Sequence, residues 1–164
     1  MINSSRLIEN FLQNYRFKIV KPYLNGDVLD FGGNKGELKK FVKGEYFLIN
    51  YDHSSMMNIY CDTIVSLAVI EHIPVKDVVE VFQRFKMILR KDGKIFITTP
   101  TKIAKPVLEF WAYLGIVDKE NIEEHQHYWT KKEIYDLSKK TGFNVIKYKK
   151  FQLGFNQYAV LEHK

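Results

Sequence analysis

The sequence predicts an α/β fold whose sheet is mainly parallel and ends in an antiparallel hairpin. Apolar runs of strand length alternate with segments of helical periodicity, which favours parallel strands with helices on both faces. A glycine-rich turn at residues 32–36 follows the first apolar run. The last two strand-like segments, Phe143–Lys149 and Gln157–Glu162, are joined by a short connection, which is typical of a hairpin.

The N-terminal part of the chain is expected to contain a long helix, two strands and a shorter helix. Apolar residues recur at helical spacing over Leu7–Tyr23, and Asn25-Gly26 ends this first helix. The first strand is Asp27–Phe31. A helix over residues 37–43 then leads into a second strand, Glu45–Tyr51.

The middle of the chain continues the alternation. Asp62–Ala68 is an apolar run that predicts the third strand. Apolar spacing indicates a helix that begins at Pro74 and continues to about residue 89. We expect a turn at Lys91–Gly93, a fourth strand over Lys94–Thr99 and an apolar helix within residues 103–116.

A capping box predicts where the last helix begins. Thr130-Lys131-Lys132-Glu133 has the T-x-x-E pattern, in which the two side chains satisfy backbone N–H groups of the first turn. Gly142 is suited to end this helix. The helix therefore leads directly into the predicted hairpin.

Length and composition set the broad class of protein. The chain has 164 residues, 46% of them hydrophobic and 27% charged, which predicts one globular domain over residues 1–164. The single cysteine, Cys61, excludes an intrachain disulfide and is typical of a reducing compartment. No apolar run reaches the roughly 20 residues that span a bilayer. We therefore expect a cytoplasmic protein without a membrane partner.

The most informative stretch is Val28-Leu29-Asp30-Phe31-Gly32-Gly33-Asn34-Lys35-Gly36. A strand that enters a helix through glycines brings backbone N–H groups close to a nucleotide-like cofactor. The spacing D-x-G-x-x-x-G differs from the dinucleotide fingerprint G-x-G-x-x-G. It resembles motif I of the class I S-adenosylmethionine (SAM) methyltransferases.

The resemblance extends along the whole chain and is closest to the small-molecule group called type 11 or type 23. Residues 61–73 resemble the family segment FDxVxSxxVLEHI, and residues 90–100 resemble LKPGGxxxxxTP. Residues 125–130, with the later Gly142-Phe143, resemble HxRxFT…GF. The resemblance implies a Rossmann-like class I methyltransferase sheet with SAM as cofactor.

The resemblance also assigns expected roles to individual residues. Asp52, which closes the second strand, matches the acid that binds both ribose hydroxyls, a pairing that suits a carboxylate and a vicinal diol. Aromatic residues of the 101–129 segment are expected toward the methyl acceptor: Trp111, Tyr113, Tyr128 and Trp129. The implied cofactor-binding residues are Asp30, Gly32, Gly33, Asn34, Gly36, Asp52, His53, Leu67 and Ala68.

Asn34 stands where the family usually has the central glycine of motif I. Asparagine is the non-glycine residue that most readily adopts positive φ. We therefore expect the loop to keep its shape.

A second departure is the short connection between Asp52 and Asp62, with only residues 53–61 between them. The family normally has a helix, a strand and another helix there, and a βαβ crossover alone needs about 10–12 residues. One strand–helix unit is therefore missing, and we expect Met56–Tyr60 to be extended or irregular. The second strand becomes a sheet edge, which proteins usually cover or pair. We accordingly hypothesise a homodimer through this region.

Three histidines are candidate catalytic residues. Methyl transfer from a sulfonium needs mainly proximity and orientation, and a hydroxyl acceptor also benefits from a general base. His72 follows the third strand, at the edge where ligands of α/β sheets bind, and His125 and His127 precede the capping box. A structural role for each histidine is the alternative interpretation.

A metal site is weighed and not favoured. Ubiquinone-pathway and small-RNA methyltransferases have an E-x-x-E-H pattern here. In this chain Glu71, His72 and His125 fit, whereas Ala68 replaces the first glutamate. Base N-methylation is also disfavoured, because the (D/N/S)-P-P-(Y/F) motif is replaced by residues 67–72.

The leading hypothesis is a SAM-dependent methyltransferase that acts on a small molecule at oxygen. The net charge of +6 and the late lysines are compatible with an RNA 2′-O-methyltransferase, so nucleic acid is an alternative partner that is not favoured. The missing unit keeps open a third alternative, a methyltransferase-like binding domain without catalysis.

Overall fold

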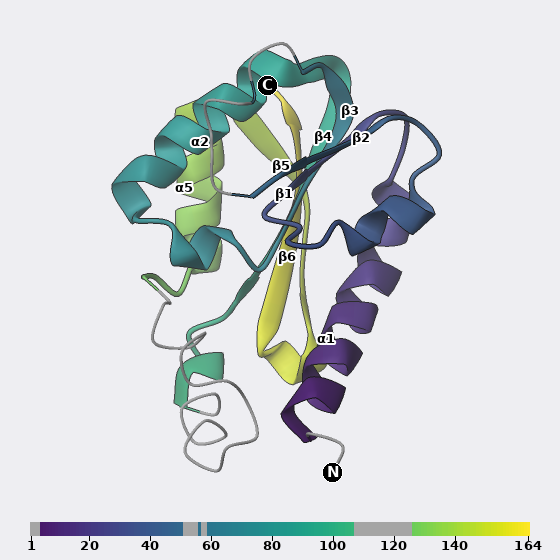
Figure 1. The fold of residues 1–164 in the computed structure, drawn as a ribbon. Coiled ribbons are helices and arrows are strands. Elements are labelled where there is room, and N and C mark those ends of the chain that lie inside the picture. The colour runs from purple at the N-terminus through teal and green to yellow at the C-terminus, as the bar shows by residue number, and fades with distance from the viewer. Residues whose placement is uncertain (1–3, 51–55, 57–58, 107–125) are drawn as a thin grey trace.

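The computed structural model describes residues 4–50, 56, 59–106 and 126–164. The described strands form one six-stranded sheet in the order β2-β1-β3-β4-β6-β5 (Figure 1). In chain order their bounds are β1 Val28–Phe31, β2 Tyr46–Ile49, β3 Cys61–Leu67, β4 Leu89–Pro100, β5 Phe143–Phe151 and β6 Asn156–His163. β2, β1, β3 and β4 are mutually parallel, and β6 is antiparallel to both β4 and β5. The predicted fold class is confirmed.

Helices cover both faces of the sheet. Figure 1 shows α2 (Val75–Ile88) and α5 (Lys131–Thr141) on one face and α1 (Ser4–Val20) on the other. Because side chains alternate along a strand, β3 contributes to both layers. Ile64 packs in the cluster that contains Phe82 and Phe85 of α2, and Val65 packs in the cluster that contains Phe17 of α1. None of the helices in the described parts of the chain is long and apolar enough to cross a membrane.

The last helix and the hairpin agree with the sequence pattern. The Thr130 hydroxyl accepts a hydrogen bond from the Glu133 N–H, and the Glu133 carboxylate accepts one from the Thr130 N–H at 2.7 Å. Gly142 ends α5 at φ 84°, in the left-handed region. β5 and β6 then pair along their whole length.

Two local expectations were wrong. The segment predicted as a helix over residues 37–43 is a 3₁₀ helix, η2 (Glu37–Phe41). The connection between β1 and β2 is short, and it ends at Gly44, which packs so closely on Gly26 that a Cβ would lie 2.3 Å from the Gly26 carbonyl oxygen. A short, tight 3₁₀ helix suits such a connection. The predicted turn at Lys91–Gly93 lies within β4, where the register with β3 shifts, so these residues form an irregularity inside a strand.

Two further expectations fall partly outside the described residues. Of the apolar helix within residues 103–116, only 103–106 are described, and 104–106 are helical. Of Met56–Tyr60, the structure describes Met56, Ile59 and Tyr60. Met56 is buried, and its carbonyl accepts a hydrogen bond from the Ile59 N–H, whereas Ile59 and Tyr60 are in neither helix nor strand.

β2 lies at the edge of the sheet, as the short connection predicted. Within the described strands it pairs with β1 alone. Leu48, in the middle of β2, is 39% exposed. The backbone groups on its outer side are therefore not used by another described strand.

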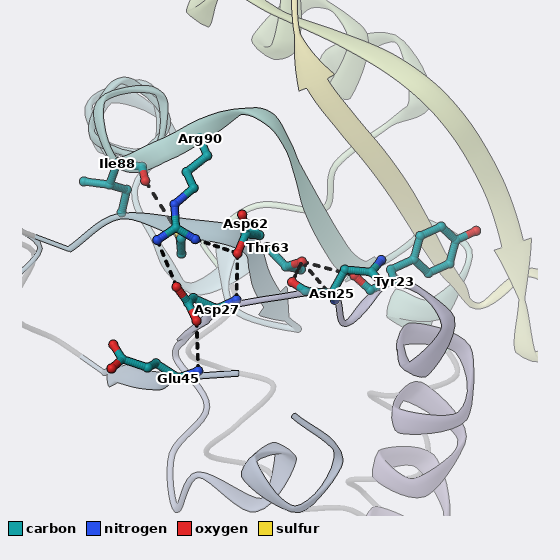
Figure 2. A network of polar contacts seen from close by, with 9 residues as sticks. Tyr23, Asn25, Asp27, Glu45, Asp62, Thr63, Ile88 and Arg90 are labelled. Carbon is teal, nitrogen blue, oxygen red and sulfur yellow. Dashed lines mark hydrogen bonds and ion pairs between the residues drawn. The ribbon is translucent and has the colours of Figure 1, made fainter. Parts of the chain in front are cut away.

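A polar network ties together the amino ends of the parallel strands (Figure 2). The Arg90 guanidinium contacts the Asp27 carboxylate at 2.9 Å and the Asp62 carboxylate at 2.6 Å. Asp62 also accepts a hydrogen bond from the Asp27 N–H, and Asp27 accepts one from the Glu45 N–H. One arginine thus links the starts of β1, β3 and β4, and Asp27 extends the link to β2.

We expect Arg90→Gln to lower the thermal unfolding midpoint, because two carboxylates lose their shared cation and the starts of three strands lose a common contact. Arg84→Gln is the matched control, since Arg84 pairs with Glu80 within one exposed helical turn and such pairs contribute little. Thermal denaturation followed by circular dichroism measures both. Equal midpoints for the two variants would contradict this role of Arg90.

Candidate functional site

The glycine-rich loop lies at the carboxyl end of β1. Gly32, Asn34 and Gly36 have φ of 79°, 52° and 69°, all in the left-handed region. Asn34 thus adopts the conformation expected of a residue in place of glycine. A Cβ at Gly32 would lie 2.4 Å from a methyl carbon of Val69, so only glycine allows the loop to approach the segment after β3.

Asn50, at the end of β2, fixes the middle of this loop. Its Oδ1 accepts a hydrogen bond from the Asn34 N–H at 2.8 Å, and its amide group donates to the Asn34 carbonyl at 3.0 Å. The Gly32 N–H donates to the Ile49 carbonyl at 2.7 Å. The end of β2 therefore shapes the loop. Sequence reasoning missed Asn50, because its neighbour Asp52 matched the family pattern and Asn50 did not.

Asp30 lies beneath the loop and is 3% exposed. Its carboxylate accepts a hydrogen bond from the Tyr46 hydroxyl at 2.6 Å, and a Cβ at Gly33 would come within 2.2 Å of the same carboxylate. Burial raises the pKa of Asp30 to about 6, and the hydrogen bond from Tyr46 opposes this rise. The sequence analysis also missed Tyr46, because nothing in the sequence distinguishes it from other residues of the predicted strand.

Leu67 and Ala68 end β3 beside this loop. Ala68 has φ of 58°, and its N–H points to both the carbonyl and the hydroxyl oxygen of Thr98 at 3.0 Å. Two acceptors on β4 thus hold a positive φ that alanine rarely adopts. Such conformations are found preferentially at functional sites.

Polar groups without hydrogen-bond partners are buried at the same edge of the sheet. Glu71, in η4 (Ile70–His72), is 1% exposed, and its carboxylate oxygens make no hydrogen bond of ordinary geometry with the described residues. The same holds for the buried Nε of Arg16 on α1 and the buried hydroxyl of Thr99 at the end of β4. Burial raises the pKa of Glu71 to about 7, opposed by its own backbone N–H, then by the charge of Arg16 and by the nearby Thr99 hydroxyl. Burial lowers the pKa of Arg16.

The segment that precedes α5 is docked onto η4. The N–H groups of Gln126 and His127 both donate to the Glu71 carbonyl, at 2.7 and 3.2 Å, and the Trp129 indole donates to the Ile70 carbonyl. Trp129 is 3% exposed and belongs to the core, so the structure gives it a packing role on this face.

The three candidate histidines are not equivalent. The His127 ring lies 3.0 Å from Glu133, a member of the capping box, and packs edge-on against Trp129, so it is held at the start of α5. His72 is half-buried and lines a cleft of about 350 Å³ between η4 and α2 with Asp77, Glu80 and Arg84. His125 lies outside the described residues, as do Asp52, His53, Trp111 and Tyr113.

Of the three residues weighed as metal ligands, Glu71 and His72 lie in η4, and His125 lies outside the described residues. No group of three or more His, Cys, Asp or Glu residues in the part of the chain that the structure describes is arranged to hold a metal ion. The structure places the glycine loop against Asp30 and Val69, at the carboxyl ends of β1 and β3, where Leu67, Ala68 and Glu71 also lie. This is the edge at which parallel α/β sheets bind ligands.

A family model described as a methyltransferase domain, of type 23, matches residues 6–148. The chain belongs to this methyltransferase family. No curated protein matches its sequence.

Solved structures share the fold of this methyltransferase domain. An O-methyltransferase family protein from Burkholderia thailandensis has a TM-score of 0.69 at 13% identity, over 93% of this chain and 56% of that one. CalO1, a methyltransferase in calicheamicin biosynthesis solved in its SAH-bound form, has a TM-score of 0.69 at 11% identity, over 95% and 55%. The cyclopropane synthase MmaA2 from Mycobacterium tuberculosis has a TM-score of 0.64 at 17% identity, over 87% and 64%. The chain thus spans between 55% and 64% of the length of these proteins.

Asp30→Asn is expected to stabilise the domain at alkaline pH. The pKa of Asp30 rises from 3.8 to about 6 on folding, so its contribution to stability is full below about pH 4 and is lost as pH rises through 6. Two pKa units correspond to about 3 kcal/mol. The difference in unfolding free energy between Asp30→Asn and wild type should therefore grow by up to about 3 kcal/mol from pH 4 to pH 8. Urea denaturation measures it, with exposed Asp92→Asn as the control. A difference independent of pH would refute this account.

Proposed function

We propose that this chain is a SAM-dependent methyltransferase that transfers a methyl group to a small-molecule acceptor, at oxygen. The observation that carries the proposal is the loop at the carboxyl end of β1, in which left-handed residues bend over the buried carboxylate of Asp30. Membership of the methyltransferase family supports the reaction class, and the SAH-bound state of CalO1 supports the cofactor.

The residues at this edge fit the chemistry of SAM. Its aminoacyl end is a zwitterion, and the site offers the carboxylates of Asp30 and Glu71 together with the Arg16 guanidinium. The Glu71 oxygens and the Arg16 Nε are buried without a hydrogen bond of ordinary geometry to the described residues, so a polar ligand at this place would supply partners for them. A side chain at position 33 would collide with the Asp30 carboxylate, so only glycine lets the loop backbone lie this close to Asp30 and to a ligand bound there.

When bound, SAM supplies an electrophilic methyl group on a sulfonium. The protein then has to orient the acceptor and exclude water. We propose His72 as a proton acceptor, because it follows β3 and lines the cleft between η4 and α2. The roles of Asp52 and His53 at the ribose remain proposals for residues outside the described ranges.

Oxygen as the acceptor atom is the finer part of the proposal. The Burkholderia neighbour is named an O-methyltransferase family protein, whereas MmaA2 is named a cyclopropane synthase, so the fold is used for more than one chemistry. Small-molecule substrates are supported by a neighbour solved with SAM and 2-hydroxy-5-methyl naphthoic acid.

A non-catalytic binding domain is the second candidate, favoured by the position of β2 at the sheet edge with Leu48 39% exposed. The same observation motivates the proposal of a homodimer that pairs or covers this edge. The mass of the protein at micromolar concentration, measured by light scattering, distinguishes a monomer from a homodimer. A monomer would contradict the dimer without bearing on catalysis.

Calorimetry with SAM and S-adenosylhomocysteine tests the proposed function. We expect both to bind, and Gly33→Ala to weaken binding by about tenfold or more, since overpacking of this kind costs about 1–3 kcal/mol. Gly142→Ala is the control: it too introduces a methyl group at a crowded position, where a Cβ would lie 2.3 Å from the Lys86 Nζ, but it lies at the end of α5 away from the loop. Absence of binding at millimolar ligand by a folded wild-type protein would refute the proposal.

A further inference from the structure

We infer that Tyr46 is a positioning residue for the cofactor loop, whose hydroxyl fixes the Asp30 carboxylate beneath Gly33. The inference rests on the proposed function, because it assigns Tyr46 to the same loop. Tyr46 lies on β2 and is part of no sequence motif, so it is an additional residue of the site.

The register of the two parallel strands explains how Tyr46 reaches Asp30. Tyr46 pairs with Val28, and Asp30 pairs with Leu48, so the two residues are diagonal neighbours on adjacent strands. A tyrosine that leans along its strand can span this diagonal. Its hydroxyl donates to Oδ2 of Asp30 at 2.6 Å.

The same hydroxyl also lies against the far end of the loop. A Cβ at Gly36 would be 3.3 Å from the Tyr46 hydroxyl oxygen, and a Cβ at Gly33 would be 2.2 Å from the Asp30 carboxylate. The Gly36 N–H donates to the Gly33 carbonyl at 2.9 Å, which closes the loop on itself. Tyr46 and Asp30 therefore form a pair on which both ends of the loop rest.

The surroundings of Asp30 make this donor important. Its partners in register, Leu48 on β2 and Val65 on β3, are apolar, and Tyr46 is the titratable side chain that acts on it in the described part of the chain. Burial raises the pKa of Asp30 to about 6 and Tyr46 lowers it. Burial and the contact with Asp30 raise the pKa of Tyr46 itself, so its hydroxyl stays protonated and continues to donate. The hydrogen bond thus favours the ionised, oriented carboxylate that a ligand ammonium group needs.

Tyr46→Phe removes the hydroxyl and keeps the ring. We measure S-adenosylhomocysteine affinity by calorimetry from pH 5 to pH 8.5, and the titration of the Asp30 carboxyl by ¹³C NMR in the ligand-free protein. Wild-type affinity should fall as pH decreases through about 6. In Tyr46→Phe, affinity at neutral pH should fall by roughly tenfold and both midpoints should move upward by about one unit. Tyr135→Phe, on exposed α5 surface, is the matched control and should keep the wild-type profile.

A second probe keeps the test decisive if Tyr46→Phe does not fold. A 3-fluorotyrosine incorporated at position 46 retains the hydroxyl and strengthens it as a donor, so the Asp30 midpoint should move downward. Failure of the wild-type protein to bind S-adenosylhomocysteine would refute the proposed function itself. Wild-type binding together with unchanged affinity and midpoints in the position-46 variants would overturn the role of Tyr46 alone.

Discussion

The site depends on the parallel register of β1, β2, β3 and β4, which the contacts around Arg90 help to fix. Arg90 joins Asp27 and Asp62 at the amino ends of these strands, and the carboxyl ends then emerge together at the opposite edge. A shift of one residue in β1 would turn Asp30 to the other face of the sheet. The polar network at the amino ends of the strands therefore helps to determine which side chains meet at their carboxyl ends.

Charged side chains at the amino ends of the strands have a different environment from those at the carboxyl ends. Around Arg90 each charge has an opposite partner within hydrogen-bond distance, and the groups are partly open to water. At the carboxyl ends of the strands, Asp30 and Glu71 are almost fully buried, and the Glu71 oxygens make no hydrogen bond of ordinary geometry with the described residues. Burial of this kind opposes folding, so the edge is held in place by the apolar layers on both faces, including Phe82 of α2 and Phe17 of α1. An unsatisfied polar edge on a well-packed sheet is a pattern expected of a binding site, where stability is given up locally for ligand contacts.

Much of the fold could be predicted from the sequence, because its local signals agree with the tertiary structure. The capping box at Thr130, the stop at Gly142 and the alternation of β5 and β6 act over a few residues. The loop was predicted because glycines and Asn34 mark positive φ directly. Tyr46, Asn50 and Arg16 could not be predicted, since Tyr46 and Asn50 act through hydrogen bonds to residues distant in sequence and Arg16 through its charge near Glu71. Residues 91–93 misled for the related reason that a register shift inside β4 has the same polar, glycine-containing sequence as a turn.

The edge strand β2 supports the glycine-rich loop of the proposed site. β2 supplies Tyr46 beneath Asp30, the Ile49 carbonyl to Gly32 and, at its end, Asn50 to Asn34, so the loop rests on a strand that pairs with β1 alone among the described strands. A strand bonded on one side opens more easily than an internal one, and any movement of β2 passes directly to the loop. A partner that covered or paired the outer side of β2 would therefore also stabilise the strand on which the loop rests.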